Sequence, residues 1–422
     1  MKIWLMNHYA TSMFRDKAGR HYWFAKELEK REHDVTVFCA STYLNNDKSV
    51  DMHGKRFITQ YDDKTQFVFV KTTPYSGNGR DRVKNMASFF FGLLKTTEHY
   101  IKQAAKPDVI IASSVHPLTM VAGIRIAKRL EVPCICEVRD LWPEAIFTFG
   151  KAGEKSLLGR LLVAGEHWIY RKADALVFTK EGDTDYLKEH GWTTEQGGDI
   201  GMEKCYYINN GVNLKGYQEQ STTEILDDAD LLDESKFNVI YTGTVRPVNN
   251  VDNMLDCAKL LKGKICYNNV QFLIYGDGSE TEKLRRRVTD EALENVKLKG
   301  FVARKYMPYV LSKSAVNILN YSQNQFNWTR GNSSNKLFEY MASGKPIIST
   351  VRMGYSIINK YHCGIELDKC TPEALTEAIM HFHDMTPAER QRYGRNAAEG
   401  VKNFDFDTLT DKLMGVIESV TA

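Results

Sequence analysis

Features that mark several classes of protein are missing from this sequence of 422 residues. Its 56 Lys and Arg residues barely exceed its 53 Asp and Glu residues, so a net charge of +3 gives no general attraction for nucleic acid. No stretch approaches the roughly 20 apolar residues of a membrane-spanning helix, and the apolar start breaks at Asn7 without a signal-peptide cleavage site. The eight Cys residues form no C-x-x-C pair, so neither a zinc knuckle nor a disulfide framework is indicated. We therefore expect a cytoplasmic protein.

Short catalytic motifs are missing as well. No Walker loop, G-x-S-x-G elbow or H-E-x-x-H pair is present, and Gly276 and Gly278 supply only two glycines of a dinucleotide fingerprint. Three D-x-D triplets occur, at residues 183–185, 228–230 and 405–407. The first is typical of a helix cap and the second lies in an acidic linker, so we assign no metal to them and expect no cofactor.

Alternating strand and helix patterns are what the sequence does contain, with 43% hydrophobic residues. Short runs rich in Val, Ile and Phe are each followed by a segment of helical period, which predicts an α/β fold with parallel sheets wrapped by helices. The strands are expected in two series, at 3–7, 35–40, 67–71, 109–113, 134–138, 175–178 and 206–208, and then at 239–241, 272–275, 296–299, 316–319 and 347–349.

The two series predict two doubly wound, Rossmann-like domains. Residues 215–236 carry acidic side chains and little strand pattern, so we place the domains at 1–214 and 215–402. Residues 403–422 form a terminal amphipathic helix that we expect to return to the first domain. Ligands bind doubly wound sheets at the carboxyl ends of the strands, so we expect the two sites to face each other across a cleft.

Residues 331–346, which read GNSSNKLFEYMASGKP, predict a short helix that ends at Gly344. Asn335, Glu339 and Ser343 form one polar stripe of this helix, while Phe338 points toward the core. The free amides at the start of the helix can bind diphosphate oxygens, and Glu339 can accept from two ribose hydroxyls. The alternative is a surface helix with Glu339 facing solvent.

This segment resembles the donor-site signature of the family 4 retaining glycosyltransferases, which have the GT-B fold of two Rossmann-like domains. The resemblance extends through nearly the whole chain, and the RDLWPE stretch at residues 139–144 is similar to bacterial enzymes that build capsule and O-antigen repeat units. The other matching pieces are residues 18–21, 113–118, 137–144, 210–213, 241–246 and 276–278.

The resemblance implies a metal-independent hexosyl or N-acetylhexosaminyl transferase that retains anomeric configuration, with a UDP-linked donor and a polyprenyl-diphosphate-linked glycan acceptor. Three charges of the family pattern are replaced here by Gly331, Thr244 and Asn249, and Arg246 lies two residues from one of these positions. The implied residues are His116, Asp140 and Arg246 for catalysis, Gly19, Gly276, Val302, Ser334, Lys336, Leu337 and Glu339 for the donor, and Arg139 and Glu144 for the acceptor.

Each of these residues also has a structural interpretation. Gly19, which we place between a strand end and a helix at 20–31, is equally consistent with an ordinary turn. His116 precedes a proline and is equally consistent with a capping or packing role. Arg139 and Asp140 are consistent with a structural ion pair. Glu144 is consistent with a cap of the following turn, and Lys336 with a solvated surface position.

Residues 80–95 combine three basic residues, Arg80, Arg82 and Lys84, with a run of apolar side chains. Such a helix can lie on a membrane surface and bring a lipid-linked sugar to the enzyme, or it can pack into the core. Two other functions also remain open at this point. One is a nucleotide-sugar-binding pseudoenzyme, which the missing charges favour, and the other is a two-domain NAD-dependent dehydrogenase, which the missing glycine fingerprint disfavours.

Overall fold

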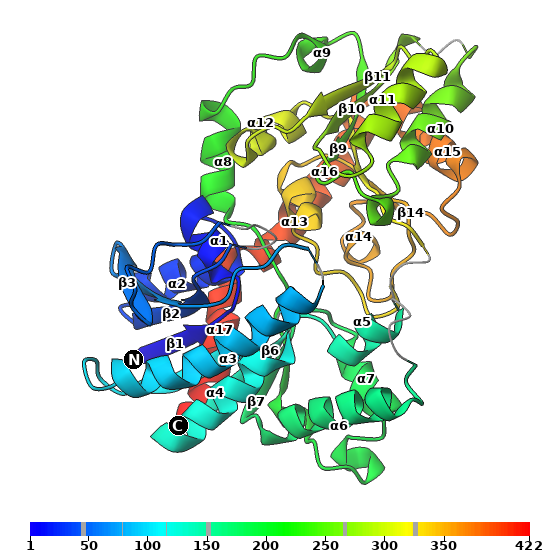
Figure 1. The fold of residues 1–422 in the computed structure, drawn as a ribbon. Helices are drawn as coiled ribbons and strands as arrows, with labels where there is room; N and C mark the ends of the chain where they lie inside the picture. Colours follow the sequence, from blue (N-terminus) through cyan, green and yellow to red (C-terminus); the bar gives the residue numbers. More distant parts are fainter. Residues whose placement is uncertain (44–47, 78, 115, 149–152, 265–267, 324–327) are drawn as a thin grey trace. The chain divides into compact units, whose positions relative to one another are not determined.

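The computed structural model describes residues 1–43, 48–77, 79–114, 116–148, 153–264, 268–323 and 328–422. The chain divides into two compact units (Figure 1). Unit 1 comprises residues 1–209 and 406–422, and unit 2 comprises residues 210–405. The sequence pattern placed these borders at 214 and 402.

The described residues of unit 1 form an eight-stranded sheet with the order β3-β4-β2-β1-β5-β6-β7-β8. Neighbouring strands are parallel except for the hairpin of β3 and β4 at one edge. The strands are β1 Lys2–Met6, β2 Asp34–Ala40, β3 Phe57–Asp62, β4 Thr65–Val70, β5 Val109–Ser113, β6 Cys134–Val138, β7 Ala175–Phe178 and β8 Cys205–Tyr207.

Both faces of this sheet are buried, as expected for parallel strands with helices on each side. Along β1, Ile3 and Leu5 point into the core beneath α2 and α17, whereas Trp4 and Met6 point into the core beneath α3 and α4. The helices of unit 1 are α1 Ala10–Asp16, α2 Arg20–Lys30, α3 Arg80–Tyr100, α4 Pro117–Leu130, α5 Trp142–Thr148, α6 Leu157–Lys172, α7 Asp183–Glu189 and α17 Phe406–Thr421, with 3-10 turns η1 Thr194–Gln196 and η2 Met202–Lys204.

Unit 2 contains a parallel sheet with the order β11-β10-β9-β12-β13-β14 among its described residues. The strands are β9 Phe237–Thr242, β10 Val270–Tyr275, β11 Val296–Gly300, β12 Val316–Leu319, β13 Ile347–Ser349 and β14 Gly364–Glu366. The helices are α8 Leu214–Thr223, α9 Ala229–Leu232, α10 Asp252–Leu261, α11 Thr281–Asp290, α12 Met307–Ser312, α13 Asn335–Ala342, α14 Ile357–Lys360, α15 Pro372–Asp384 and α16 Pro387–Gly400, with 3-10 turns η3 Pro247–Asn249, η5 Arg304–Tyr306 and η6 Val401–Phe404.

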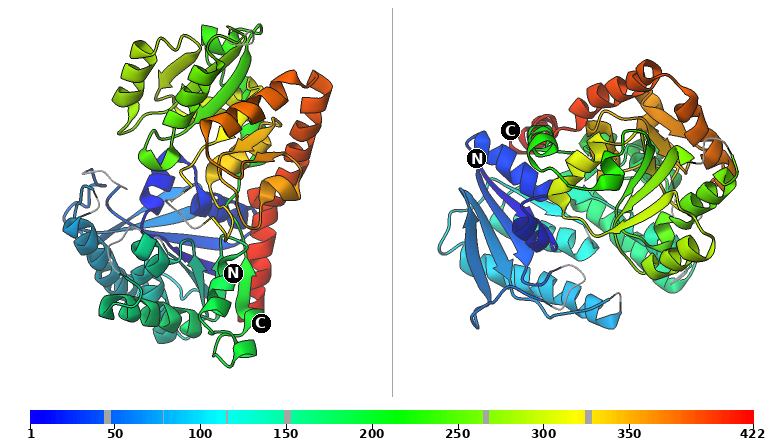
Figure 2. Two further views of the ribbon diagram at one scale, coloured as in Figure 1. Left: turned by 90° about the vertical axis from the view of Figure 1, so that its right-hand side faces the viewer. Right: turned by 90° about the horizontal axis from the view of Figure 1, so that it is seen from above.

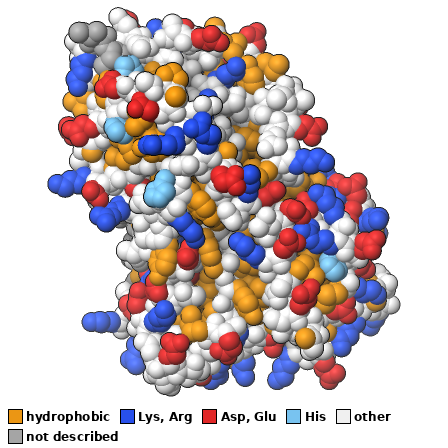
Figure 3. All heavy atoms as spheres, turned by 180° about the vertical axis from the view of Figure 1, so that it is seen from behind, with side chains coloured by type: hydrophobic (Ala, Val, Ile, Leu, Met, Phe, Trp, Pro, Cys, Tyr) orange, Lys and Arg blue, Asp and Glu red, His pale blue; other side chains and the backbone are white. Residues whose placement is uncertain are grey.

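The predicted fold class is confirmed, because the twelve predicted strands all form and both sheets are wound by helices. Two edge strands, β3 and β14, escape the sequence pattern. Most of the β3 side chains remain at least partly exposed, and β14 has only three residues, so neither shows a buried apolar run. Lys, Arg, Asp and Glu side chains are interspersed over the face seen in Figure 3, in keeping with the small net charge.

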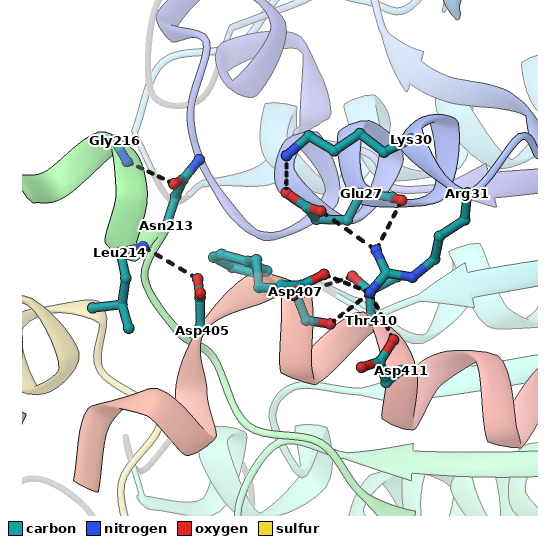
Figure 4. Close-up of polar contacts among 11 residues, drawn as sticks. Glu27, Lys30, Arg31, Asn213, Leu214, Gly216, Asp405, Asp407, Thr410 and Asp411 are labelled. Carbon is teal, nitrogen blue, oxygen red and sulfur yellow. Dashed lines mark hydrogen bonds and ion pairs between the residues drawn. The ribbon is translucent and has the colours of Figure 1, made fainter. Parts of the chain in front are cut away.

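The chain crosses between the units twice, and the two crossing segments pair with each other inside unit 2. The Val212 N–H donates to the Phe404 carbonyl at 3.0 Å. The Leu214 N–H donates to the Asp405 carboxylate at 3.1 Å, as Figure 4 shows. Asn213 caps α8 by accepting the Gly216 N–H at 2.9 Å. These bonds fix where unit 2 begins and ends.

Helix α17 packs against α2 in unit 1, and Figure 2 shows it in red beside the sheet. Phe406 and Phe24 meet edge to face with ring centroids 5.4 Å apart, and both are buried. At the rim, the Arg31 guanidinium lies 2.6 Å from the carboxylates of both Asp407 and Asp411 (Figure 4). The helix is therefore held by an apolar core with an exposed ionic rim.

Substitutions in α17 are expected to separate these two contributions. Phe406→Ala removes a buried aromatic side chain and should lower the free energy of unfolding by about 3–5 kcal/mol. Asp411→Asn removes an exposed partner of Arg31 and should cost less than about 1 kcal/mol. Urea unfolding monitored by circular dichroism measures both values. Equal losses in the two variants would contradict this assignment.

Candidate active site

The start of α13 in unit 2 has a helix terminus that its own side chains leave uncapped. Ser334 occupies the N-cap position, but its side chain makes no capping bond to the helix amides. Instead its hydroxyl accepts from the Tyr321 hydroxyl at 2.7 Å, while its N–H donates to the Asn332 side chain at 2.7 Å. The first amides of the helix, including those of Asn335 and Lys336, therefore remain suited to an anion.

Lys336 brings a positive charge to the carboxyl end of β9. Its Nζ donates to the Tyr241 hydroxyl at 2.9 Å and lies 4.5 Å from the centroid of that ring and 5.6 Å from that of Tyr321. Burial lowers the pKa of Lys336 to about 8, although Glu339 counteracts part of this effect. The ammonium is thus partly desolvated between two aromatic rings.

The position of Lys336 depends on Gly243, the first residue after β9. Gly243 has φ 133°, and a Cβ at this position would lie 2.6 Å from Lys336 Nζ. Gly276, after β10, has φ 149°, and a Cβ there would collide with the Gly243 carbonyl oxygen. The two glycines thus let the loops after β9 and β10 lie against each other and against the lysine.

Glu339 lies one turn beyond Lys336, and its side chain is 18% exposed. Its Oε1 accepts from the Arg304 guanidinium at 2.7 Å. Oε2 forms no hydrogen bond with the part of the chain that the structure describes. The sequence correctly predicted which side of this helix is apolar and which is polar. Phe338 and Met341 are fully buried, and Asn335 is exposed.

The two sequence positions that lack the family charges form a neutral pair. The Thr244 hydroxyl donates to the Asn249 side chain at 3.2 Å. Arg246, which begins the turn η3, is exposed and forms no ion pair within the described ranges. Lys336 thus brings a cation to the end of β9 from α13, and Arg246 follows β9 in the sequence. Val302, after β11, is partly buried against the apolar core of unit 2.

In unit 1, His116 caps the start of α4 and is fully buried. Its Nε2 lies 2.6 Å from Nδ1 of His8, at the end of β1. Burial and then Arg82 lower the pKa of His116 to about 3, and burial also lowers that of His8. The His116 Nδ1 is buried without a hydrogen-bond partner in the described chain. The neighbouring Val115 lies outside the described residues.

A buried ionic cluster lies beside this pair, and sequence reasoning did not select its members as site residues. Glu137 in β6 lies 2.7 Å from the Arg20 guanidinium and 3.0 Å from His21 Nε2. Arg20 also donates to the carbonyls of Ile208 and Asn209. Burial would raise the pKa of Glu137, but Arg20 and His21 outweigh this effect and hold the pKa well below its usual range.

The proton positions in this cluster follow from Asn7. Its Oδ1 accepts the Tyr9 N–H at 2.9 Å, so its Nδ2 faces Nδ1 of His21 at 2.7 Å. His21 therefore carries its proton on Nε2, the ring nitrogen that lies 3.0 Å from a Glu137 oxygen. The motif pieces at 18–21 and 137–144 contained these residues, and their mutual contact was the information that the sequence lacked.

The structure corrects the expected position of Gly19. Helix α1 separates it from β1, so Gly19 lies in a turn between two helices and not directly after a strand. It has φ 103° and precedes α2, which ends at Lys30. A side chain at this position would be strained, so the turn itself accounts for the glycine.

Asp140 and Arg139 follow β6, as expected, and Asp140 is exposed. Within the described chain, the two side chains form no ion pair with each other. The alternative of a structural Arg139–Asp140 ion pair is therefore wrong. The Arg139 N–H donates to the Ser114 hydroxyl at 3.0 Å, which ties this loop to the end of β5. Glu144 lies in the first turn of α5.

The three D-x-D triplets have structural partners. Asp183 accepts from the Lys180 N–H at 3.2 Å, and Asp228 lies 2.6 Å from Lys299. Asp405 and Asp407 make the contacts described above. Among the described residues, no three His, Cys, Asp or Glu side chains lie close enough together to hold a metal ion.

Helix α3 differs from the exposed apolar helix that the sequence suggested. Phe89, Phe90 and Leu93 are buried in the core, whereas Val83 and Phe91 are exposed by 63% and 61%. The alternative of core packing is therefore right for most of the apolar run. No helix within the described ranges is long and apolar enough to cross a membrane.

Two family descriptions match almost the whole chain. Residues 20–196 match the glycosyl transferase 4-like domain, and residues 222–400 match glycosyl transferases group 1. The chain is therefore a glycosyltransferase of family 4 with the GT-B fold. This assignment sets aside the dehydrogenase alternative. No curated protein matches the chain by sequence.

Solved structures share this fold at low sequence identity. Sucrose-phosphate synthase from Thermosynechococcus elongatus is similar with a TM-score of 0.71 and 15% identity, over 99% of this chain and 98% of that chain. HepE from Anabaena, solved in complex with UDP, has a TM-score of 0.67 and 14% identity, over 99% and 100% of the two chains. An α,α-trehalose-phosphate synthase (UDP-forming) from Burkholderia vietnamiensis has a TM-score of 0.70 and 12% identity, over 99% and 100%.

The buried ionic cluster predicts a large stability effect. Glu137→Gln keeps the shape of the side chain but leaves Arg20 without its counter-charge, which should cost about 3–5 kcal/mol in the free energy of unfolding. The control is Glu98→Gln, which breaks an exposed ion pair with Arg129 and should cost less than about 1 kcal/mol. Thermal unfolding at neutral pH distinguishes the two. A Glu137→Gln protein as stable as the control would contradict the cluster.

Proposed function

We propose that this chain transfers a hexosyl or N-acetylhexosaminyl group from a UDP-linked donor to a polyprenyl-diphosphate-linked glycan in bacterial surface polysaccharide synthesis, with retention of configuration. The observation that carries the proposal is the start of α13, where uncapped amides, the Lys336 ammonium and the Glu339 carboxylate lie within about one helical turn. The HepE complex with UDP supports a uridine nucleotide.

The donor groups have separate partners in this proposal. The diphosphate oxygens accept from Lys336, from Arg246 and from the first α13 amides. The Leu337 N–H, which donates to the Ser334 carbonyl at 3.2 Å, would be shared with the diphosphate. The ribose hydroxyls donate to Glu339, whose Arg304 partner orients the carboxylate. The remaining donor contacts that we propose are the backbone at Val302, Gly276 and Gly19 and the side chain of Ser334.

The proposed chemistry breaks the bond between the anomeric carbon and the donor phosphate oxygen. The acceptor hydroxyl oxygen bonds to the same face of that carbon, and its proton passes to the departing phosphate. Lys336, Arg246 and the helix amides stabilise the charge on the leaving UDP. Because the diphosphate accepts the proton, the step needs no separate general base.

The acceptor side is proposed for unit 1, where His116 contacts the transferred sugar and Asp140 contacts the acceptor, with Arg139 and Glu144 beside it. The exposed Asp140 carboxylate after β6 supports this role. The enzyme would then act in the cytoplasm at the inner face of the cell membrane. Exposed Val83 and Phe91 on α3 support membrane contact through residues 80–95.

A nucleotide-sugar-binding pseudoenzyme is the second candidate, because Gly331, Thr244 and Asn249 stand where the family has charged residues. Purified protein incubated with radiolabelled UDP-sugars and bacterial membranes that contain lipid-linked glycans distinguishes the two. We expect label in the organic-extractable fraction and an anomeric coupling constant that shows retention. UDP binding without transfer or hydrolysis would favour the pseudoenzyme.

Glu339→Ala tests the donor site directly. Loss of the ribose contacts should weaken UDP binding by about tenfold or more in calorimetric titrations, since each charged hydrogen bond contributes about 1.5–3 kcal/mol. Arg304→Gln, which keeps the carboxylate but removes its ion-pair partner, should weaken binding less. UDP affinity equal to wild type in Glu339→Ala would remove the ribose role.

Lys336 should make UDP binding depend on pH. Its pKa of about 8 in the free protein means that raising the pH through 8 discharges the ammonium, so that binding of the diphosphate then requires uptake of a proton from solution by Lys336. Above that pH, affinity should fall by up to about tenfold per pH unit. Lys336→Arg keeps the charge and should flatten this profile between pH 7 and 9. A flat wild-type profile would contradict the contact.

A further inference from the structure

A small apolar pocket in unit 1 lies outside the residues assigned above, except for Asp140 on its lining. Its volume is about 180 Å³, and it lies between the starts of α4 and α5 and the middle of α6. Ligand pockets that hold a whole small molecule are usually about 300–1,000 Å³, so this one suits only part of a ligand. Its lining includes Leu118, Val121, Pro143, Leu161 and Leu162.

Of the two acidic residues on the lining, Asp140 and Glu166, the buried Glu166 already has hydrogen-bond partners. Glu166 is buried, and its two carboxylate oxygens accept from the hydroxyls of Tyr170 and Tyr186 at 2.7 Å each. Burial raises the pKa of Glu166 to about 7, so much of this group is uncharged at neutral pH. Apart from the exposed Asp140 carboxylate on its lining, the pocket therefore offers apolar surface to what it binds.

Exposed leucines extend this apolar surface along α6. Leu157, Leu158 and Leu161 are exposed by 87%, 54% and 68%, and Leu161 also lines the pocket. Clustered exposure of this kind marks an interaction site more often than a scattered surface leucine does. The exposed cations Lys155 and Arg160 flank the leucines, with Glu154 as the acidic neighbour.

The surrounding surface is basic. Helices α3, α4 and α6 lie side by side over one face of the sheet (Figure 1). Together they carry ten Lys or Arg residues and three Asp or Glu residues, one of which is the buried Glu166. Since the whole chain has a net charge of only +3, this face carries the excess, and it suits a ligand that is both apolar and anionic.

We propose that this pocket binds the hydrocarbon chain of the lipid-linked acceptor next to its diphosphate, with Lys155 and Arg160 near the anionic group. The proposal rests on the proposed function and adds the acceptor subsite to it. Asp140 connects the two, because this exposed carboxylate lines the pocket and is also the residue proposed to contact the acceptor. A hydrocarbon chain bound in this pocket would place the head of the lipid-linked acceptor beside Asp140.

Gly165 allows the pocket to be filled without strain. It lines the pocket in the middle of α6, and a Cβ added there meets nothing within 4 Å. Gly165→Leu should block the pocket while favouring the helix by its propensity. Gly415 on α17 is the matched control, since it is also helical and a Cβ added there also meets nothing within 4 Å.

The probe is dodecyl phosphate below its micellar concentration, measured by tryptophan fluorescence and calorimetry with inorganic phosphate as the head-group control. We expect wild type and Gly415→Leu to bind dodecyl phosphate equally. Gly165→Leu should bind it at least about tenfold more weakly, a loss of about 1.4 kcal/mol. All three proteins should bind inorganic phosphate much more weakly than wild type binds dodecyl phosphate. Val121→Gln, which makes the wall polar, should also weaken binding. Unchanged binding in both pocket variants would overturn the proposal.

UDP affinity separates this proposal from the proposed function, because Gly165 lies outside the donor residues. We expect it to be unchanged in Gly165→Leu, while transfer to lipid-linked glycan falls. Normal lipid transfer by that variant would contradict the pocket and leave the donor assignment standing. If Leu157→Gln with Leu158→Gln instead converts a dimer to a monomer in sedimentation and leaves dodecyl phosphate binding intact, the surface binds a second copy of the chain and the proposal is wrong.

Discussion

The placement of one ammonium group is the constraint on which the proposed donor site in unit 2 depends. Lys336 reaches from α13 to the end of β9, where Gly243 leaves it room and Tyr241 and Tyr321 surround it with aromatic faces. The tyrosines compensate for part of the lost hydration, but burial still lowers the pKa of the lysine to about 8. A partly desolvated cation beside free helix amides attracts a diphosphate more strongly than a solvated surface lysine would.

This arrangement explains how the chain can lack charges that its family has elsewhere. Thr244 and Asn249 bond to each other and supply no cation, whereas Lys336 supplies one to the same strand end from another element. The proposed donor site needs a positive charge close to the diphosphate, and residues from different elements can supply that charge. The family pattern has two carboxylates near the start of α13. Gly331 replaces one of them, and the other, Glu339, accepts from Arg304.

Much of the fold could be predicted, because most of the parallel strands are short buried apolar runs, whereas the edge strands β3 and β14, which the sequence did not predict, are at least partly exposed along their length. The helix of α13 and the burial of Phe338 also followed from spacing. The contacts of Arg20 and His21 with Glu137 could not, since more than a hundred residues separate the partners. The pairing of His116 with His8, which is a further contact of this kind, likewise depends on which strands become neighbours.

A crystal structure of the protein with UDP tests the central claim most directly. The account predicts diphosphate oxygens within hydrogen-bonding distance of Lys336 Nζ and of the first amides of α13, with both ribose hydroxyls on the Glu339 carboxylate. A nucleotide bound with its phosphates away from that helix start, or one whose phosphates leave the Lys336 ammonium against Tyr241, would contradict it.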